Sequence, residues 1–225
     1  GNTQDRISTG LKVASGKDNA AYFAISSTMK GDSGMTKAID EGLTLTKNSV
    51  STGRLGAETV ADLARQFVDR VAFAQAEGVD LAKVQEELTE LVGRMNTSIE
   101  QSTFNGSSAI AAVAGTAETV TVVTGIARDS AGALSTTSFT YDKADLRTVT
   151  AALGAIDVVT AGADPLTSAG LLETALQTAE TNLALAVDGA TSLGIAEKSI
   201  ETQQSFLGEL SKRLDSGIGS MIDAD

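Results

Sequence analysis

Residues 172–214 read LETALQTAETNLALAVDGATSLGIAEKSIETQQSFLGELSKRL, and an apolar side chain returns at every seventh position. This register comprises Leu172, Ala179, Ala186, Leu193, Ile200, Leu207 and Leu214. Unbroken heptad spacing predicts one long helix that packs this stripe against a neighbouring helix. A second row starts as Leu176, Leu183 and Ala190, then moves over to Ala196, Gln203 and Leu210. The glycines at 189, 194 and 208 weaken the helix and allow local bends.

The first 104 residues are rich in Leu, Ala and Glu and predict helices that partner this stripe. One helix is predicted to start after an N-cap at Asp80, with a seam of Leu81, Val84, Leu88, Leu91, Met95 and Ile99. A second is predicted over 57–76, ending at Glu77-Gly78. A third is predicted over 19–54, where glycines 31, 34, 42 and 53 allow breaks or a loose middle.

The segment between these helical parts is rich in Thr, Ser, Gly and Val. Residues 119–124 and 136–141 predict two strands, and Asp129-Ser130-Ala131-Gly132 predicts the turn of a β-hairpin. Residues 149–153 and 156–159 predict either a small helix or another strand. The expected fold is mainly α, an elongated bundle of long N- and C-terminal helices with a small β-rich (α+β) insertion. We expect residues 1–104 and 166–225 to form the two parts of a helical rod domain, and 105–165 a variable outer domain.

Composition argues against catalysis. The chain has no His and no Cys, which removes imidazole, thiol and disulfide chemistry together. Glu86 and Glu90 share a helix face but lie off the apolar seam, and Asp223-Ala224-Asp225 lacks the spaced ligands of a calcium loop. We expect no enzyme activity, no cofactor and no metal site.

The net charge of −12 disfavours nucleic acid and anionic membranes as partners. No apolar run reaches the length of a membrane helix, so we expect no membrane insertion. The first residues, Gly1-Asn2-Thr3-Gln4-Asp5, do not form a cleavable signal peptide and lack Met, and we expect a trimmed chain.

Residues 6–21, RISTGLKVASGKDNAA, closely resemble the N-terminal signature of flagellins, which reads Arg-Leu-Ser-Ser-Gly-Leu-Arg and continues to Asp-Asp-Ala-Ala-Gly. Asn19 replaces the second Asp, and Tyr22 stands where Gly is usual. Phe104-Asn105-Gly106 resembles the Phe-Asn-Gly that ends the family's N-terminal helical segment. Residues 203–207 and 216–225 resemble the C-terminal segment of one branch of flagellins. The insertion is not covered by the resemblance.

The resemblance implies a structural subunit that polymerises into the bacterial flagellar filament for motility. It implies an extracellular location, reached through the flagellar export apparatus. The implied partners are further copies of the chain, the flagellar cap, hook-associated proteins and an export chaperone. Since the family's extreme ends form coiled coils, we expect this chain to be a flagellin core lacking both, and to stay monomeric alone. Subunit-contact and family-motif positions implied by the resemblance are Arg6, Gly10, Asp18, Asn19, Phe104, Asn105, Gly106 and Asp223.

One stretch departs from many flagellins. In many flagellins, the vertebrate innate immune receptor for flagellin binds the sequence Gln-Arg-Val-Arg-Glu-Leu. The corresponding residues here are Gln66-Phe67-Val68-Asp69-Arg70-Val71. Phe67 and Asp69 replace the two Arg and remove their charge and hydrogen-bond donors, so we expect weak or absent recognition by that receptor.

Two alternatives stay open. A junction protein between hook and filament shares the terminal signatures but occurs in few copies. A cell-surface binding protein or adhesin would use the insertion, where Phe139 and Tyr141 are the aromatic side chains able to stack on a sugar. The simpler interpretation of these two residues is that they pack the hairpin onto the helices.

Overall fold

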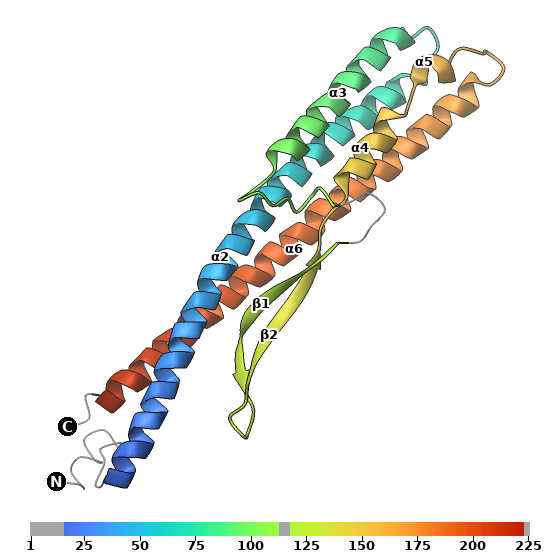
Figure 1. The fold of residues 1–225 in the computed structure, drawn as a ribbon. Coiled ribbons are helices and arrows are strands. Elements are labelled where there is room, and N and C mark those ends of the chain that lie inside the picture. The colour runs from blue at the N-terminus through green and yellow to red at the C-terminus, as the bar shows by residue number, and fades with distance from the viewer. Residues whose placement is uncertain (1–15, 113–117, 223–225) are drawn as a thin grey trace. The chain divides into compact units, whose positions relative to one another are not determined.

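The computed structural model describes residues 16–112 and 118–222 and is mainly helical (Figure 1). Its helices are α2 (Gly16–Phe73), α3 (Leu81–Gln101), α4 (Leu146–Gly154), α5 (Val158–Ala161) and α6 (Ser168–Ile222), and its strands are β1 (Thr119–Arg128) and β2 (Leu134–Asp142). The chain divides into two compact units. The bundle unit comprises Lys47–Val120 and Thr140–Lys198, and the hairpin unit comprises the residues up to Thr46, Thr121–Phe139 and those from Ser199 onward.

The core of the bundle unit is built from the predicted stripes. Leu172, Ala179, Ala186 and Leu193 on α6 are all buried. The buried residues of α3 are those predicted from its spacing, Val84, Leu88, Leu91, Met95 and Ile99, whereas Leu81 is half-buried. The buried face of α2 in this unit is apolar. Its fully buried residues are Val50, Ala57, Val60, Ala64, Phe67 and Val71.

The start of α3 follows the prediction. Asp80 has extended backbone geometry and its side chain accepts a hydrogen bond from the backbone N–H of Lys83 at 3.2 Å. This satisfies one of the N–H groups that a helix leaves without a partner in its first turn. The preceding connection turns at Gly78, whose φ of 77° is the left-handed conformation that favours glycine.

The two helices predicted over 19–54 and 57–76 are one continuous helix, α2, which ends at Phe73. Gly53 and Gly56 do not interrupt it; they allow another segment to cross it closely. A Cβ at Gly53 would lie 2.7 Å from the Ala109 Cβ, and one at Gly56 would lie 2.8 Å from the Ile110 Cδ1. Gly53, where the sequence predicts a possible break, therefore serves a contact between helix α2 and the 109–110 segment, as does Gly56.

Residues 149–153 fall in the helix α4, and the second half of 156–159 falls in the short helix α5, which begins at Val158 after an N-cap at Asp157; neither segment forms a strand. Both helices pack against α3. Gln85 on α3 accepts from the Val158 backbone N–H at 3.0 Å and donates to the Ile156 carbonyl at 3.3 Å. One α3 side chain thus fixes the link between α4 and α5.

The predicted hairpin is present as a two-stranded antiparallel sheet. Its register is marked by the Thr124 and Thr137 hydroxyls, 2.8 Å apart, and by the Thr119 hydroxyl, which donates to Asp142 at 2.7 Å. The turn lies where it is predicted, with the Gly132 N–H donating to the Asp129 carbonyl at 3.0 Å. Phe139 and Tyr141 are half-buried, and burial raises the pKa of the Tyr141 phenol.

The hairpin unit has a different interior. Ile200 and Leu207 of the heptad stripe are buried here, and Leu214 is half-buried. On α2, however, the buried positions include Ser26, Ser33 and Thr36. Leu43 is the one apolar residue among the described buried positions of α2 in this unit, so the seam is mostly polar here and apolar in the bundle unit.

α2 and α6 pack together within each unit and run antiparallel. In the hairpin unit, Ser33 pairs with Asp215, and Thr44 pairs with Gln204. In the bundle unit, Arg54 pairs with Glu197, and the Gln75 side chain donates to the Leu172 carbonyl at 2.9 Å. Rising numbers on α2 meet falling numbers on α6 in both units, so the two ends of the chain form a paired helical rod segment in each.

Candidate assembly surface

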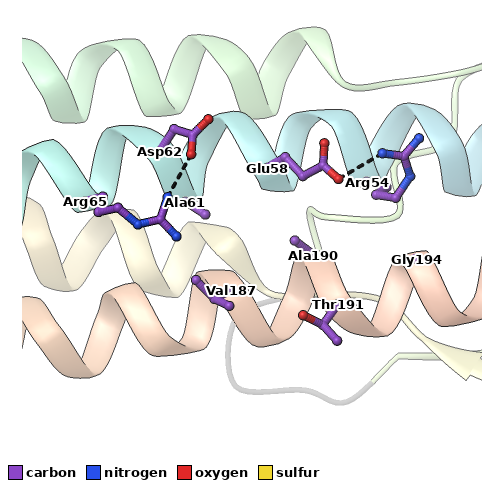
Figure 2. A pocket seen from close by; sticks show the side chains of 9 residues that line it. All are labelled: Arg54, Glu58, Ala61, Asp62, Arg65, Val187, Ala190, Thr191 and Gly194. Atoms are coloured by element: carbon purple, nitrogen blue, oxygen red, sulfur yellow. Dashed lines mark hydrogen bonds and ion pairs between the residues drawn. The ribbon is translucent and has the colours of Figure 1, made fainter.

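A groove of about 360 Å³ lies between α2 and α6 in the bundle unit, and we call it the α2–α6 groove (Figure 2). Its α2 side carries Arg54, Glu58, Ala61, Asp62 and Arg65. Its α6 side carries Val187, Ala190, Thr191 and Gly194. One wall is therefore charged and the other is made of small side chains, an arrangement that admits a protruding apolar side chain with polar surroundings.

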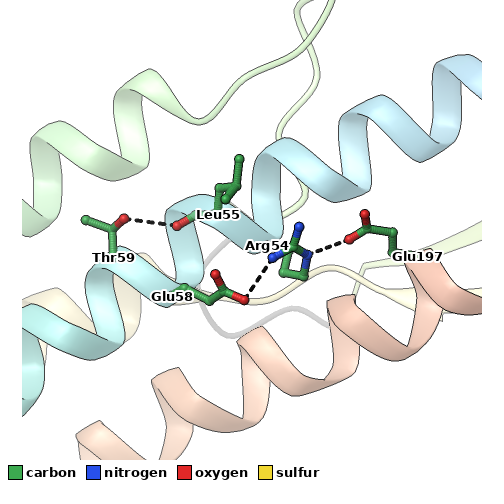
Figure 3. Close-up of polar contacts among 5 residues, drawn as sticks. All are labelled: Arg54, Leu55, Glu58, Thr59 and Glu197. Carbon is green, nitrogen blue, oxygen red and sulfur yellow. Dashed lines mark hydrogen bonds and ion pairs between the residues drawn. The ribbon is translucent and has the colours of Figure 1, made fainter.

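Arg54 anchors one end of this groove (Figure 3). Its Nε donates to Glu197 on α6 at 2.5 Å, and its Nη1 donates to Glu58 at 2.9 Å. The hydrogen bond to Glu197, followed by that to Glu58, raises the pKa of Arg54 above its already high ordinary value. Arg54 therefore stays charged at every physiological pH and joins the two helices. Arg65, at the other end, pairs with Asp62 at 2.9 Å and is largely exposed.

A second groove of about 300 Å³ lies between α2 and α3, lined by Gln66, Asp69, Arg70, Glu87, Glu90, Leu91 and Arg94. The Arg70 Nε lies 2.6 Å from Glu87 Oε2, and its guanidinium lies 4.4 Å from the centre of the Phe73 ring. Two receptor-motif positions, the unchanged Gln66 and the altered Asp69, are exposed in this groove, whereas the altered Phe67 is 0% exposed. Phe67 is thus a core residue and offers no surface to a receptor.

Polar contacts join the elements of the hairpin unit. Ser33 donates to Asp215 at 2.7 Å, and the Lys37 Nζ lies 3.0 Å from the same carboxylate. These two contacts, that of Ser33 first, lower the pKa of Asp215. The guanidinium of Arg128 donates to both carboxylate oxygens of Asp32. Its Nη2 lies 2.9 Å from Oδ1, and its Nε lies 3.1 Å from Oδ2. This pairing attaches β1 to α2.

The family-motif positions divide into three groups. Arg6, Gly10 and Asp223 lie outside the described residues. Asp18 and Asn19 fall in the first turns of α2, where the backbone alone is described. The structure brings Phe104, Asn105 and Gly106 together in a tight turn, closed by reciprocal backbone hydrogen bonds between Phe104 and Ser107 at 2.8 Å and 3.0 Å. The φ angles of 54° at Asn105 and 76° at Gly106 explain why the turn uses Asn-Gly.

Two classes of site have no counterpart in the described part of the chain. Within residues 16–112 and 118–222, no cluster of three or more acidic, His or Cys side chains is placed to hold a metal ion. Among the same residues, no helix has the combination of length and apolar character that crossing a bilayer demands.

The polar contacts between helices are not predicted by the sequence. Arg54 and Glu197 are 143 positions apart, and Ser33 and Asp215 are 182 positions apart. Heptad spacing identifies which face of a helix is buried, but it does not say which charged residue on one helix meets which on another. A single sequence contains no signal for these pairs.

Comparison with known proteins agrees with this architecture. Residues 1–115 match the family model described as the bacterial flagellin N-terminal helical region. The chain is 32% identical to a flagellin of Brucella melitensis over 230 residues, which is 99% of this chain and 77% of that protein. It is 28% identical to flagellin C of Rhizobium meliloti, covering 99% of this chain and 80% of that protein.

Other matches are partial or distant. Flagellin A of Rhizobium meliloti is 37% identical over 140 residues, so the chain spans only 36% of that relative's length. A solved structure from Vibrio parahaemolyticus, assigned as a flagellar hook-associated protein, shares the fold with a TM-score of 0.62 at 14% identity, covering 87% of this chain and 95% of that one. With the family match over half the chain and whole-chain relatives at about 30% identity, the protein belongs to the bacterial flagellins, the non-enzymatic structural proteins that polymerise into the extracellular flagellar filament.

Proposed function

We propose that the α2–α6 pairing forms the rod by which this flagellin packs against neighbouring copies in the filament. The observation that carries the proposal is the antiparallel pairing of the two helices, which buries the heptad stripe and leaves their charged flanks outward. Filaments grow when a contact joins different surfaces of identical subunits and does not close into a ring. Long helices with an apolar seam and polar flanks provide many such surfaces.

The family-motif residues have a role in this proposal. Arg6, Gly10, Asp18, Asn19, Phe104, Asn105, Gly106 and Asp223 contribute to subunit contacts or to the local geometry that supports them. The position of the turn at Phe104 supports a role for it in holding the local geometry. It reverses the chain after α3 and leads into Ala109 and Ile110, which are buried and pass close to Gly53 and Gly56 on α2.

The test is assembly by the full gene product in a motile bacterium whose own flagellin genes have been deleted. Restored filaments in electron micrographs and restored swimming would support the proposal, and secreted protein that forms no filament would contradict it. Sedimentation of residues 1–225 alone, beside the full product, separates assembly driven by these residues from assembly that needs more of the protein. A monomer is expected for residues 1–225 alone.

The flagellar cap, hook-associated proteins and an export chaperone remain proposed partners of the full product. Co-purification of the chaperone from the cytoplasm before secretion would test one of them. The alternative of a junction protein makes a different prediction, a handful of copies per filament. Quantitative immunolabelling along purified filaments distinguishes the two, because a filament subunit labels the whole length.

We also propose that the vertebrate flagellin receptor binds this protein weakly or not at all. The support is that Phe67 is in the core and that exposed Asp69 adds a negative charge to a groove already holding Glu87 and Glu90. A cell reporter for that receptor should respond to the full product much less than to enterobacterial flagellin. A response of equal potency would refute the proposal, and an Asp69→Arg variant is the matched gain-of-recognition test.

A further inference from the structure

The turn before α6 holds one leucine out into solvent. Leu166 is 92% exposed, the most exposed of the large apolar side chains described. Asp164 fixes its backbone: the carboxylate accepts from the Leu166 N–H at 2.9 Å, and the carbonyl accepts from the Ser168 N–H at 2.8 Å. Pro165 between them has a locked φ. Because the turn is already ordered, docking Leu166 on a partner would cost little conformational entropy.

The surroundings of Leu166 are acidic. Residues 155–167 contain Asp157 and Asp164 and no Lys or Arg. The loop 74–80, which joins α2 to α3 in the same unit, contains Glu77 and Asp80 and likewise no basic residue. A surface that accepts Leu166 should therefore combine an apolar socket with cationic side chains.

The α2–α6 groove meets the first condition through its small residues and the second through Arg65, since Arg54 is held by Glu197 and Glu58. Its small residues Ala190 and Gly194 leave space for an apolar side chain, and Arg54 and Arg65 stand on its α2 side (Figure 2). Arg65 pairs with Asp62 in an exposed contact of a kind that contributes little, and a guanidinium has five donors, so it can also bind an incoming carboxylate.

Two further grooves among the described residues fit less well. The α2–α3 groove sets Arg70 and Arg94 against three carboxylates. The groove between α4 and α6 sets Lys143 against three aspartates. The lining of the α2–α6 groove has two residues of each charge, and Glu197 is a further carboxylate beside Arg54. What distinguishes this groove is its wall of small side chains on α6, whereas Leu91 is the one apolar residue that lines the α2–α3 groove.

We propose that Leu166 of one copy inserts into the α2–α6 groove of the next copy, an inference that rests on the filament function proposed above. Leu166 cannot fill its own groove. Thr191 lies 23 residues beyond the start of α6 at Ser168, which is about 35 Å along a helix. Leu166 and the α2–α6 groove are therefore two different surfaces of one chain. Such a heterologous contact repeats without closing and lengthens a fibre.

Cysteine cross-linking tests this contact directly, because the chain contains no Cys. In the full gene product, Leu166→Cys is combined with Thr191→Cys, an exposed position in the groove. Filaments are assembled under reducing conditions and then oxidised. A disulfide needs Cα atoms within about 7 Å, so it forms between copies and not within one. The expected result is a ladder of dimers, trimers and higher multimers on a denaturing gel.

The matched control combines Leu166→Cys with Ser192→Cys, an exposed neighbour that lines the groove between α4 and α6. It should give no ladder. Filaments without a ladder from the first pair, or with an equal ladder from the control, would overturn the inference while leaving the filament function intact. Absence of filaments from the unmodified product would instead count against the filament function.

A second variant does not depend on disulfide formation. Leu166→Ser should leave the thermal melt unchanged, because the side chain is outside the core. Losing the burial of one leucine per contact should raise the critical concentration for polymerisation about tenfold or more. An unchanged critical concentration would overturn the inference.

Discussion

Arg54 and Glu197, one from each end of the chain, form a charged hydrogen bond from Nε of the first to Oε2 of the second, with side chains only 26% and 14% exposed. The pair joins α2 to α6 within the bundle unit (Figure 3). Removing one partner leaves the other with a desolvated and unmatched charge. The cost of such a loss exceeds that of breaking an exposed ion pair.

The Arg54→Met substitution should lower the free energy of unfolding by about 1–3 kcal/mol, because Glu197 loses its partner while remaining largely covered. Urea unfolding followed by circular dichroism measures this. Glu58→Gln is the control: Glu58 is 52% exposed, and the loss should stay within about 0.5 kcal/mol. Equal losses of stability from both variants would show that Glu197 does not need Arg54 as its charge partner.

Gly56→Ala should destabilise the protein although alanine favours helices. A Cβ there collides with the Ser102 side chain and with Ile110, and overpacking costs about 1–3 kcal/mol. Gly93→Ala on α3 has no atom within 4 Å of the new Cβ, so it should instead stabilise by up to about 1 kcal/mol. Thermal melts of the two variants should shift in opposite directions. A stabilised Gly56→Ala variant would contradict the close crossing.

Thr36→Val should stabilise the hairpin unit. Thr36 is 1% exposed, and its hydroxyl makes no hydrogen bond to a described residue. Replacing that hydroxyl with a methyl group of similar shape removes a desolvation cost and should add about 1 kcal/mol. Thr44→Val is the comparison, since the Thr44 hydroxyl is exposed and accepts from Gln204 at 2.8 Å. Chemical denaturation should show a gain for the first variant only.

Acidification should weaken the contact between Ser33, Lys37 and Asp215. The folded-state pKa of Asp215 is lowered, so its stabilising contribution is complete above the ordinary carboxyl pKa of about 4 and is lost as pH falls through the lower folded value. Asp215→Asn should reduce the dependence of stability on pH below about pH 4. Amide hydrogen exchange of residues 30–40 across pH 3–6 would report it, after correction for intrinsic exchange rates. An identical profile in the variant would exclude Asp215 as the cause.

Hydrogen exchange should also distinguish the two units. Among the described residues of α2, the buried positions in the hairpin unit are the polar Ser26, Ser33 and Thr36 and the single apolar Leu43, whereas those in the bundle unit, such as Val50, Ala57 and Phe67, are apolar. Apolar burial sets the free energy of local opening, so amides over 24–40 should exchange faster than those over 57–71. Equal protection along the whole of α2 would contradict this expectation.

The sequence by itself determined where α3 and α6 lie and which of their faces are buried, but it did not show that α2 is one continuous helix. Leu172 to Leu207 and Val84 to Ile99 are buried as their spacing predicts, because a helix turns through a fixed angle per residue and an apolar stripe must leave water. The Asp80 cap and the 129–132 turn are local, so neighbouring residues specify them. The Arg6–Ala21 motif pointed to the family without any coordinates.

Only the tertiary structure decided which glycine, charged and polar residues contact segments that lie far away in the sequence. Gly53 is predicted from the sequence as a possible break, yet the packing of Ala109 and Ile110 against α2 requires glycine there and at Gly56. Arg54 meets Glu197, and Phe67 is in the core rather than on a receptor-facing surface. These outcomes depend on which segments meet in space, and periodicity along one chain describes each segment's faces without naming its partner.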